Sequence, residues 1–202
     1  MTTDPLPPSS RRARYWRRLQ ARLSPVQKID SWLFMEVNRL PHPPLLNTFM
    51  RLLATVMNRG DGWLVGLLLI AVWNQWQGKL KGRKVFWRVA PALWLTSIVV
   101  EHVLKKIFRR PRPYTQLAQA VLVGVPPKHY SFPSGHSASG FAGAWLLSRY
   151  YPQWQGAFYG LAVLVAFCRV YLGAHYPIDV IAGAVSGVSL AEFFRRLLRM
   201  RR

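Results

Sequence analysis

Five apolar runs, separated by polar or basic segments, follow one another through most of the chain. They cover residues 62–78, 89–100, 137–148, 150–168 and 180–191, and none contains a charged residue. A membrane-spanning helix needs about 20 mostly apolar residues, so the shorter runs must continue into their polar flanks. Five successive runs with aromatic flanks favour an all-α, polytopic integral membrane bundle of five or six transmembrane helices. A soluble helical bundle is the alternative.

The N-terminal region departs from this pattern. The stretch "RRARYWRRLQARL" (11–23) is typical of a basic amphipathic helix at a membrane surface, and a disordered basic tail is the alternative. A cleavable signal is not indicated, because no apolar core follows the arginines directly. We therefore divide the chain into a basic tail or interfacial helix at 1–26 and a membrane domain at 27–202. Residues 27–60 are amphipathic, and either cross the membrane or form one or two interfacial or re-entrant helices.

Basic residues also predict the orientation. Cytoplasmic loops of membrane proteins are enriched in lysine and arginine, so the basic loop 79–84 and the arginine-rich tail 195–202 are predicted to be cytoplasmic. Counting crossings from that loop places segments 105–136 and 169–178 on the outer side. The side of the N-terminus depends on whether 27–60 crosses. Two polar, histidine-bearing segments that are distant in sequence are thus predicted to share one face.

The composition limits the partners and cofactors. The chain has 28 basic and only 7 acidic residues, a net charge of +21, which suits an anionic partner such as nucleic acid, an acidic lipid surface or a phosphorylated substrate. The basic residues flank apolar runs, which argues against a nucleic-acid-binding surface. The single cysteine, Cys168, excludes an internal disulfide and argues against a thiolate metal cage. No pattern resembles a metal site, so neither metal nor cofactor is predicted.

The stretch "HYSFPSGHSASG" (129–140) interrupts the apolar pattern with small polar residues. Ser134 is suited to cap the following helix, and Gly135 would let backbone amides approach an anion at the positive helix terminus. His136 would then sit at the mouth of this site, positioned to pass a proton. Taken alone, an ordinary capped turn with an incidental histidine explains the stretch better.

A second polar segment, "RVYLGAHYPID" (169–179), combines a histidine with a carboxylate. Pro177 suits the first position of a helix, which puts Asp179 in its first turn, able to reach back towards His175. A carboxylate bound to one imidazole nitrogen leaves the other as a nucleophile or base. The alternative is that Asp179 merely caps the helix and His175 is a passive loop residue.

The third segment, "KKIFRRPRP" (105–113), is basic although it is predicted to lie outside. Arginine offers paired donors that match phosphate oxygens and lysine adds a compact charge, so Lys105 and Arg112, with Arg169, are candidate phosphate ligands. Lipid headgroup contact is the simpler explanation for Lys106, Arg109 and Arg110. Two histidines, one acid and three cations on one face suggest phosphoryl transfer through a phosphohistidine.

Together the segments form an ordered pattern: Lys105-x6-Arg112-Pro113, Pro133-Ser134-Gly135-His136 and Arg169-x5-His175-x3-Asp179. This pattern, within 105–179, resembles the tripartite signature of the type 2 phosphatidic acid phosphatase family, which includes bacterial membrane lipid phosphatases and is related to the vanadium haloperoxidases. One departure is Cys168, which stands where the family usually has serine. We expect it to alter detail without abolishing activity.

The resemblance implies a role for each residue. His175 would be the nucleophile, oriented by Asp179, and His136 the acid that protonates the leaving oxygen. The phosphate cradle would consist of Lys105, Arg112, Arg169, Ser134 and the amide of Gly135. Water would then release phosphate from His175, without a metal.

The implied substrate is a lipid phosphate or diphosphate at the outer face of a bacterial inner membrane, with the C-terminus cytoplasmic. Undecaprenyl diphosphate is the leading candidate. Phosphatidylglycerophosphate, phosphatidic acid and lipid A are the alternatives. An inactive membrane scaffold is the non-enzymatic one.

Overall fold

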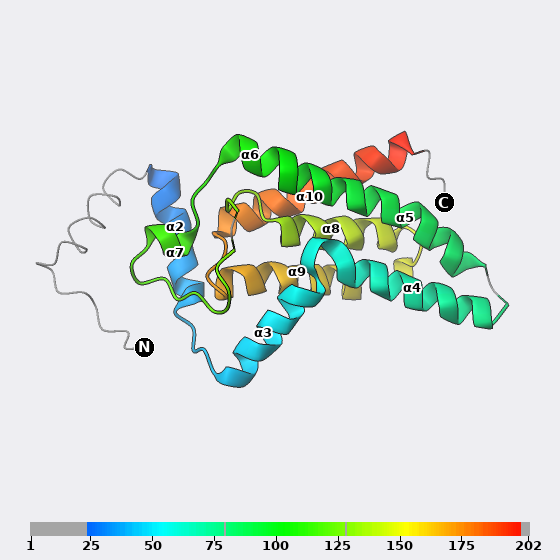
Figure 1. Ribbon diagram of the computed structural model, residues 1–202, viewed down its shortest axis with the longest axis horizontal. Helices are drawn as coiled ribbons and strands as arrows, with labels where there is room; N and C mark the ends of the chain where they lie inside the picture. The colour runs from blue at the N-terminus through cyan, green and yellow to red at the C-terminus, as the bar shows by residue number, and fades with distance from the viewer. Residues whose placement is uncertain (1–23, 79, 128, 199–202) are drawn as a thin grey trace, which may run out of the picture.

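The computed structural model describes residues 24–78, 80–127 and 129–198 (Figure 1). All regular structure in these residues is helical, which confirms the all-α prediction. The elements are α2 (Pro25–Asn38), α3 (Pro44–Val56), η1 (Asn58–Gly60), α4 (Asp61–Trp76), α5 (Lys81–Ile98), η2 (Val99–Leu104), α6 (Lys105–Phe108), α7 (Pro113–Gln116), α8 (Gly135–Ser148), η3 (Pro152–Trp154), α9 (Gln155–Tyr171) and α10 (Pro177–Leu197). The helix expected at 11–23 lies outside the described residues.

Each of the five apolar runs forms the body of a helix, namely α4, α5, α8, α9 and α10. The second run continues well beyond its apolar part. Helix α5 passes through the π-helical segment η2 into α6, so that one rod extends from Lys81 to Phe108 (Figure 1). For this run, the predicted extension into charged flanks is confirmed.

The number of membrane crossings does not follow from helix length alone. Within the described residues, α10 is long and apolar enough to span a membrane, and α3 with η1 and α4 forms a second such unit if the 45° bend between them is ignored. Helix α8 has 14 residues, or about 21 Å at 1.5 Å per residue, against a hydrocarbon core of about 30 Å. Five or six crossings therefore remain a prediction.

Helices α8 and α10 pack closely through two glycines. A Cβ atom at Gly183 would collide with the carbonyl oxygen of Ser134, and one at Gly187 with the backbone of Ala138. Two small residues spaced by four let helix backbones approach closely. This contact holds the start of α8 against the start of α10, where the predicted site residues lie.

Substituting Gly187 by alanine is expected to destabilise the bundle. The added methyl group would meet backbone atoms of Ala138, which cannot move aside as a side chain can, and such overpacking costs about 1–3 kcal/mol. Gly160→Ala is the matched control, because its Cβ would enter open space and alanine favours a helix by about 1 kcal/mol. The measurement is the thermal unfolding midpoint in detergent. Equal midpoints for the two variants would contradict the close α8–α10 contact.

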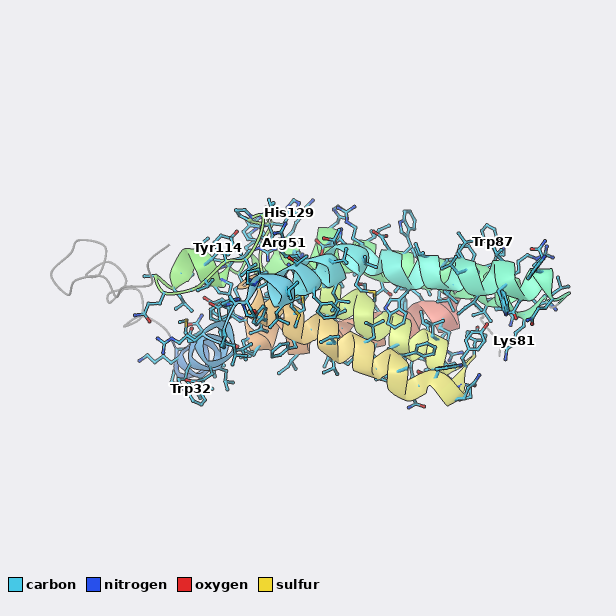
Figure 2. The ribbon with its side chains drawn as sticks, turned by 90° about the horizontal axis from the view of Figure 1, so that it is seen from below. Trp32, Arg51, Lys81, Trp87, Tyr114 and His129 are labelled. Carbon is cyan, nitrogen blue, oxygen red and sulfur yellow. The ribbon has the colours of Figure 1, made fainter. Side chains whose placement is uncertain are left out.

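The segments that were predicted to lie on opposite sides of the membrane lie at opposite ends of the bundle. At one end, Lys81 Nζ lies 4.9 Å from the ring centroid of Tyr151, which joins the α4–α5 loop to the α8–α9 turn, and the C-terminus of α10 lies nearby (Figure 1). Figure 2 shows Tyr114 and His129 towards the opposite end from Lys81. The two histidine-bearing segments share that opposite end, as predicted. Their side of the membrane remains a prediction.

Helix α2 lies across this second end. It starts with a capping box, in which Ser24 Oγ accepts from the Gln27 N–H at 3.3 Å and Gln27 Oε1 accepts from the Ser24 N–H at 2.9 Å. Its fully buried side chains are Asp30, Phe34 and Asn38, which follow one another at intervals of four and share one face. Helix α2 is thus amphipathic, as predicted for this region, and its buried face packs against the bundle.

Candidate active site

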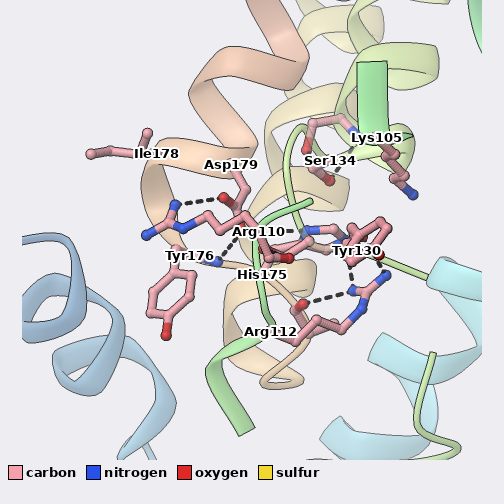
Figure 3. Close-up of polar contacts among 12 residues, drawn as sticks. Lys105, Arg110, Arg112, Tyr130, Ser134, His175, Tyr176, Ile178 and Asp179 are labelled. Atoms are coloured by element: carbon pink, nitrogen blue, oxygen red, sulfur yellow. Dashed lines mark hydrogen bonds and ion pairs between the residues drawn. The ribbon is translucent and has the colours of Figure 1, made fainter. Parts of the chain in front are cut away.

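The three sequence segments meet through backbone hydrogen bonds (Figure 3). The Ser134 N–H donates to the Asp179 carbonyl oxygen at 2.9 Å, and the Ser131 N–H donates to the Arg110 carbonyl oxygen at 2.9 Å. The Arg169 carbonyl oxygen accepts from the N–H groups of Ala174 and His175 at 3.1 and 3.2 Å. These bonds bring the segments that carry the eight predicted site residues together at one end of the bundle.

His175 is buried in the loop between α9 and α10. Its Nε2 lies 3.3 Å from Arg112 Nη1. Because a guanidinium only donates hydrogen bonds, Nε2 must accept, and the proton of the neutral ring resides on Nδ1. The Nδ1 atom lies 3.7 Å from Asp179 Oδ2, beyond hydrogen-bonding distance, and has no hydrogen-bond partner among the described residues. The predicted contact between Asp179 and His175 is therefore longer than a hydrogen bond. The ring nevertheless has the predicted tautomer, in which Nδ1 faces the carboxylate and Nε2 carries the lone pair.

Asp179 is fully buried in the first turn of α10. Its Oδ2 accepts from the Tyr176 N–H at 2.9 Å, and its Oδ1 accepts from Arg110 Nη1 at 2.6 Å. The two interpretations left open by the sequence are therefore compatible, because the carboxylate caps the helix and also faces His175.

The surroundings of His175 favour a neutral ring. Burial, and then the positive charges of Arg112, Arg169 and Lys105, lower the pKa of His175 well below its ordinary value. Burial away from water disfavours the charged imidazolium, and neighbouring cations disfavour it further. At neutral pH the ring is therefore neutral, and its Nε2 keeps a lone pair, which accepts from Arg112 in this structure. The three predicted cations therefore all lie close enough to act electrostatically on this one histidine.

Lys105 is paired with a carboxylate that the sequence interpretation missed. Its Nζ donates to the two carboxylate oxygens of Glu101 at 2.6 and 2.8 Å. A Cβ atom at Gly135 would collide with the same carboxylate, so Glu101 stands at the N-terminus of α8, where the phosphate is expected. The spacing of four between Glu101 and Lys105 was the available signal.

Substituting Glu101 by glutamine is expected to tighten inhibition by inorganic phosphate several-fold. The carboxylate neutralises Lys105 and occupies a position that favours an anion, so its removal leaves a more positive site. The inhibition constant of phosphate measures this effect. Asp61→Asn, at the start of α4, is a control for the loss of one acidic residue. Unchanged or weaker inhibition in Glu101→Gln would contradict competition between Glu101 and phosphate.

The two arginines of the cluster differ in how they are bonded. Arg112 donates to the carbonyl oxygens of His129 at 2.6 Å, Tyr130 at 3.1 Å and Ala174 at 2.8 Å. It therefore ties two loops together, and it can still serve a phosphate through its charge and its remaining N–H group. Arg169 is also buried, but its Nε has no hydrogen-bond partner among the described residues. A buried unpaired donor costs about 1–3 kcal/mol, which a phosphate oxygen would offset.

Helix α8 starts as predicted, with Ser134 as its cap. The Ser134 Oγ accepts from the Ser137 N–H at 3.4 Å and from the Ser137 hydroxyl at 3.0 Å. In the same first turn, His136 Nε2 lies 3.0 Å from the Ala54 carbonyl oxygen of α3. A carbonyl only accepts, so this nitrogen carries a proton. Any proton donated to a ligand therefore comes from Nδ1 of the charged ring, or from Nε2 after it leaves Ala54.

Cys168 also contacts α3. Its buried thiol donates to the Met50 carbonyl oxygen at 3.0 Å. A serine hydroxyl is also a hydrogen-bond donor, so the cysteine occupies a position where either residue can make this bond. The departure from the family signature therefore leaves this contact with α3 in place.

The interpretation of Arg110 as a lipid headgroup contact is wrong. Its side chain is 19% exposed and binds two buried carboxylates, Asp179 at 2.6 Å and Asp30 at 2.5 Å. The sequence offered no signal for this arrangement, because Asp30 lies on a helix far upstream. By contrast, Lys106 and Arg109 are exposed.

Comparison with known proteins places this cluster in a family. The family model described as the PAP2 superfamily matches residues 86–202, which is more than half of the chain. The putative undecaprenyl-diphosphatase YbjG of Escherichia coli is 31% identical over 81% of this chain and 79% of that protein. An undecaprenyl-diphosphatase of Sulfolobus acidocaldarius is 38% identical over 96 residues, which make up 46% of each chain.

Solved structures give the same result. Aquifex aeolicus LpxE is 28% identical, with a TM-score of 0.60 over 80% of this chain and 91% of that chain. The PAP2 type phosphatidylglycerolphosphate phosphatase of Bacillus subtilis is 24% identical and shares the fold, with a TM-score of 0.62 over 93% and 94%. The resemblance drawn from the three motifs is confirmed, and the chain belongs to the PAP2 superfamily of phosphatases.

Proposed function

We propose that this protein is a metal-independent membrane phosphatase that hydrolyses a lipid phosphate or diphosphate through a phosphohistidine. The observation that carries the proposal is the state of His175. Its Nε2 accepts from Arg112, its Nδ1 faces Asp179, and three cations surround the ring. A neutral, oriented imidazole inside a cationic cluster is suited to attack phosphorus. An inactive scaffold would not require this arrangement.

The reaction follows from these positions. The lone pair of His175 Nε2 attacks phosphorus, and the bond from phosphorus to the leaving oxygen breaks. His136 donates a proton to that oxygen, while Asp179 stabilises the positive charge of the substituted ring. Water, deprotonated by His136, then attacks phosphorus and the P–N bond breaks, which returns a neutral His175 and releases phosphate. The cradle, which stabilises negative charge in both transition states, consists of Lys105, Arg112, Arg169, Ser134 and the amide of Gly135.

The surface supports a membrane location. Large apolar side chains that are at least half exposed lie along four helices: Val65, Leu68, Leu69, Trp94, Val163, Ile181 and Val185. Soluble monomers rarely expose apolar patches of this extent. With the basic loop 79–84 and tail 195–202 cytoplasmic, the candidate site faces the periplasmic side of a bacterial inner membrane. The bundle would have five or six crossings, with α2 at the interface.

The substrate that we propose is undecaprenyl diphosphate, which would be converted to undecaprenyl phosphate. Its support is the recurrence of that substrate in the names of relatives, including the Escherichia coli protein that matches most of this chain. Phosphatidylglycerophosphate, phosphatidic acid and lipid A remain candidates. A lipid A 1-phosphatase of Rhizobium etli, for example, is 44% identical over 57 residues.

A substrate panel tests this proposal. Phosphate release by the purified protein in detergent is compared for undecaprenyl diphosphate, phosphatidylglycerophosphate, phosphatidic acid and lipid A. We expect undecaprenyl diphosphate to give the largest kcat/KM. A larger value for another lipid would reassign the substrate, and no release from any of the four would overturn the proposed activity.

Excess EDTA is expected to leave the rate of phosphate release unchanged. The positive charge that a metal ion would supply to the transferred phosphoryl group comes instead from Lys105, Arg112 and Arg169. The rate is measured before and after chelation, with Zn²⁺ and Mg²⁺ added back in turn. A loss of activity that either ion restores would contradict the metal-independent reaction.

A further inference from the structure

Arg110 joins two buried carboxylates from opposite parts of the chain. Its Nη1 donates to Asp179 Oδ1 at 2.6 Å and its Nη2 to Asp30 Oδ2 at 2.5 Å, and its guanidinium lies 4.1 Å from the ring centroid of Tyr176. Asp30 and Asp179 are both fully buried. Two carboxylates removed from water need a shared cation, because an uncompensated buried charge is strongly destabilising. Arg110 supplies that cation.

Asp30 also holds the helix that carries Asp179. Its second oxygen, Oδ1, accepts from the Ile178 N–H at 2.9 Å, one of the free N–H groups in the first turn of α10. Carboxylates stabilise helix N-termini in this position. One side chain of α2 therefore binds the partner of Asp179 and also sets the position of the turn in which Asp179 lies.

The rest of the inner face of α2 reinforces this contact. The rings of Phe34 and Tyr176 lie 5.6 Å apart. Asn38 Nδ2 donates to the carbonyl oxygens of Val121 at 2.9 Å and Tyr171 at 3.0 Å. The buried face of α2 thus reaches both the end of α9 and the start of α10, the two elements that flank His175.

We infer that Asp30 and Arg110 are positioning residues for the Asp179–His175 pair, and that α2 forms part of the active site. This inference rests on the proposed function of that pair. Both terminal nitrogens of Arg110 bind carboxylates, so this arginine acts through Asp179 and does not belong to the phosphate cradle. Asp30 lies outside residues 86–202, which the family model matches.

Arg110 and Asp30 carry opposite charges, so their removal is expected to shift the His175 pKa in opposite directions. The charged or titratable groups near Asp179 are Arg110, Tyr176 and His175, with Asp30 bound to the same arginine. Those that act on His175 besides Asp179 are Arg112, Arg169, Lys105 and His136, and both variants leave them in place. Arg110→Gln removes a cation that neutralises Asp179, so the carboxylate favours a proton on His175 more strongly and the His175 pKa should rise. Asp30→Asn keeps an acceptor for the Ile178 N–H but no longer neutralises Arg110, so the His175 pKa should fall. Simple loosening of the fold would not shift the two values in opposite directions.

The experiment combines kinetics with titration of His175. We expect kcat to fall about tenfold to a hundredfold in Arg110→Gln and Asp30→Asn with little change in KM, because the cradle is intact and a small misplacement of reacting groups has an effect of this size. Arg110→Lys should recover part of the loss. In the double variant the losses should be less than multiplicative, since the two residues act through one contact. The exposed neighbours provide the controls, Glu36→Gln on α2 and Arg109→Gln beside Arg110.

Titration of the His175 ring, by NMR of the ¹³C-labelled full chain in detergent, does not depend on turnover. Opposite pKa shifts in the two variants would support the inference even if the substrate panel failed. Wild-type kcat and an unshifted His175 in both variants would overturn it. Parallel losses of kcat and thermal stability, with no pKa shift and no recovery in Arg110→Lys, would also overturn it, because they would indicate a merely structural role.

Discussion

Replacing His175 by alanine is expected to abolish phosphate release, with kcat lower by on the order of 10⁴-fold or more, the size seen when a nucleophile is removed. The Nε2 lone pair of this residue is directed by Arg112 at 3.3 Å, and alanine offers no atom to replace it. The measurement is steady-state phosphate release in detergent. His102→Ala is the matched control, because His102 is exposed on η2, near Lys105 but outside the cluster.

The same variant tests the covalent intermediate. Quenching within milliseconds of mixing wild-type protein with ³²P-labelled substrate should trap acid-labile phosphate on the protein, and His175→Ala should trap none. Robust turnover without any trapped label would show that water attacks the substrate directly. Retained activity in His175→Ala would remove the nucleophile from the mechanism altogether.

Replacing His136 by alanine is expected to lower kcat by about 10²–10⁴-fold, the usual contribution of a general acid or base. The effect should depend on the leaving group. An alcohol, such as the one released from phosphatidic acid, needs a proton as it departs, whereas p-nitrophenolate is stable as an anion. The reaction of p-nitrophenyl phosphate should therefore lose much less of its rate of phosphoenzyme formation. Single-turnover measurements with phosphatidic acid and p-nitrophenyl phosphate give this comparison.

His136 should also matter in the second step, because it is the base that activates water. In His136→Ala, labelled phosphohistidine is therefore expected to accumulate with p-nitrophenyl phosphate to a higher level than in the wild type. His42→Ala, a histidine bonded within the α2–α3 connection, is the control for loss of an imidazole. Equal losses for both leaving groups, without accumulation, would assign His136 a binding role in place of proton transfer.

The starts of the two helices that carry the site were predictable because they depend on neighbouring residues. Ser134 caps α8 through the Ser137 N–H, three residues away, and Pro177 opens α10 with Asp179 in its first turn. Such bonds form within one helical turn, so residue type and spacing suffice to predict them. The approach of Gly183 to α8 was likewise visible as a repeat of small residues.

The contacts made by α2 and α3 could not be predicted in this way. Asp30 and Arg110 pair at 2.5 Å although they are 80 residues apart, and His136 meets a carbonyl of α3 that any residue at position 54 would provide. Neither contact has a spacing rule, because its partners meet only when whole helices pack. The role of Arg110 was therefore misjudged from its basic, proline-rich surroundings.

By itself, the sequence determined that the chain is helical, that three motifs supply two histidines, an aspartate and three cations, and which helix ends hold them. The helices follow from hydrophobic periodicity and their starts from bonds within one turn, whereas the roles of the three motifs come from their resemblance to the family signature. Only the tertiary structure decided how the groups are charged and oriented. Arg112 holds the lone pair of His175, Glu101 neutralises Lys105, and Asp30 with Arg110 holds Asp179. Protonation and orientation depend on burial and on distant partners, which exist only once the bundle has packed.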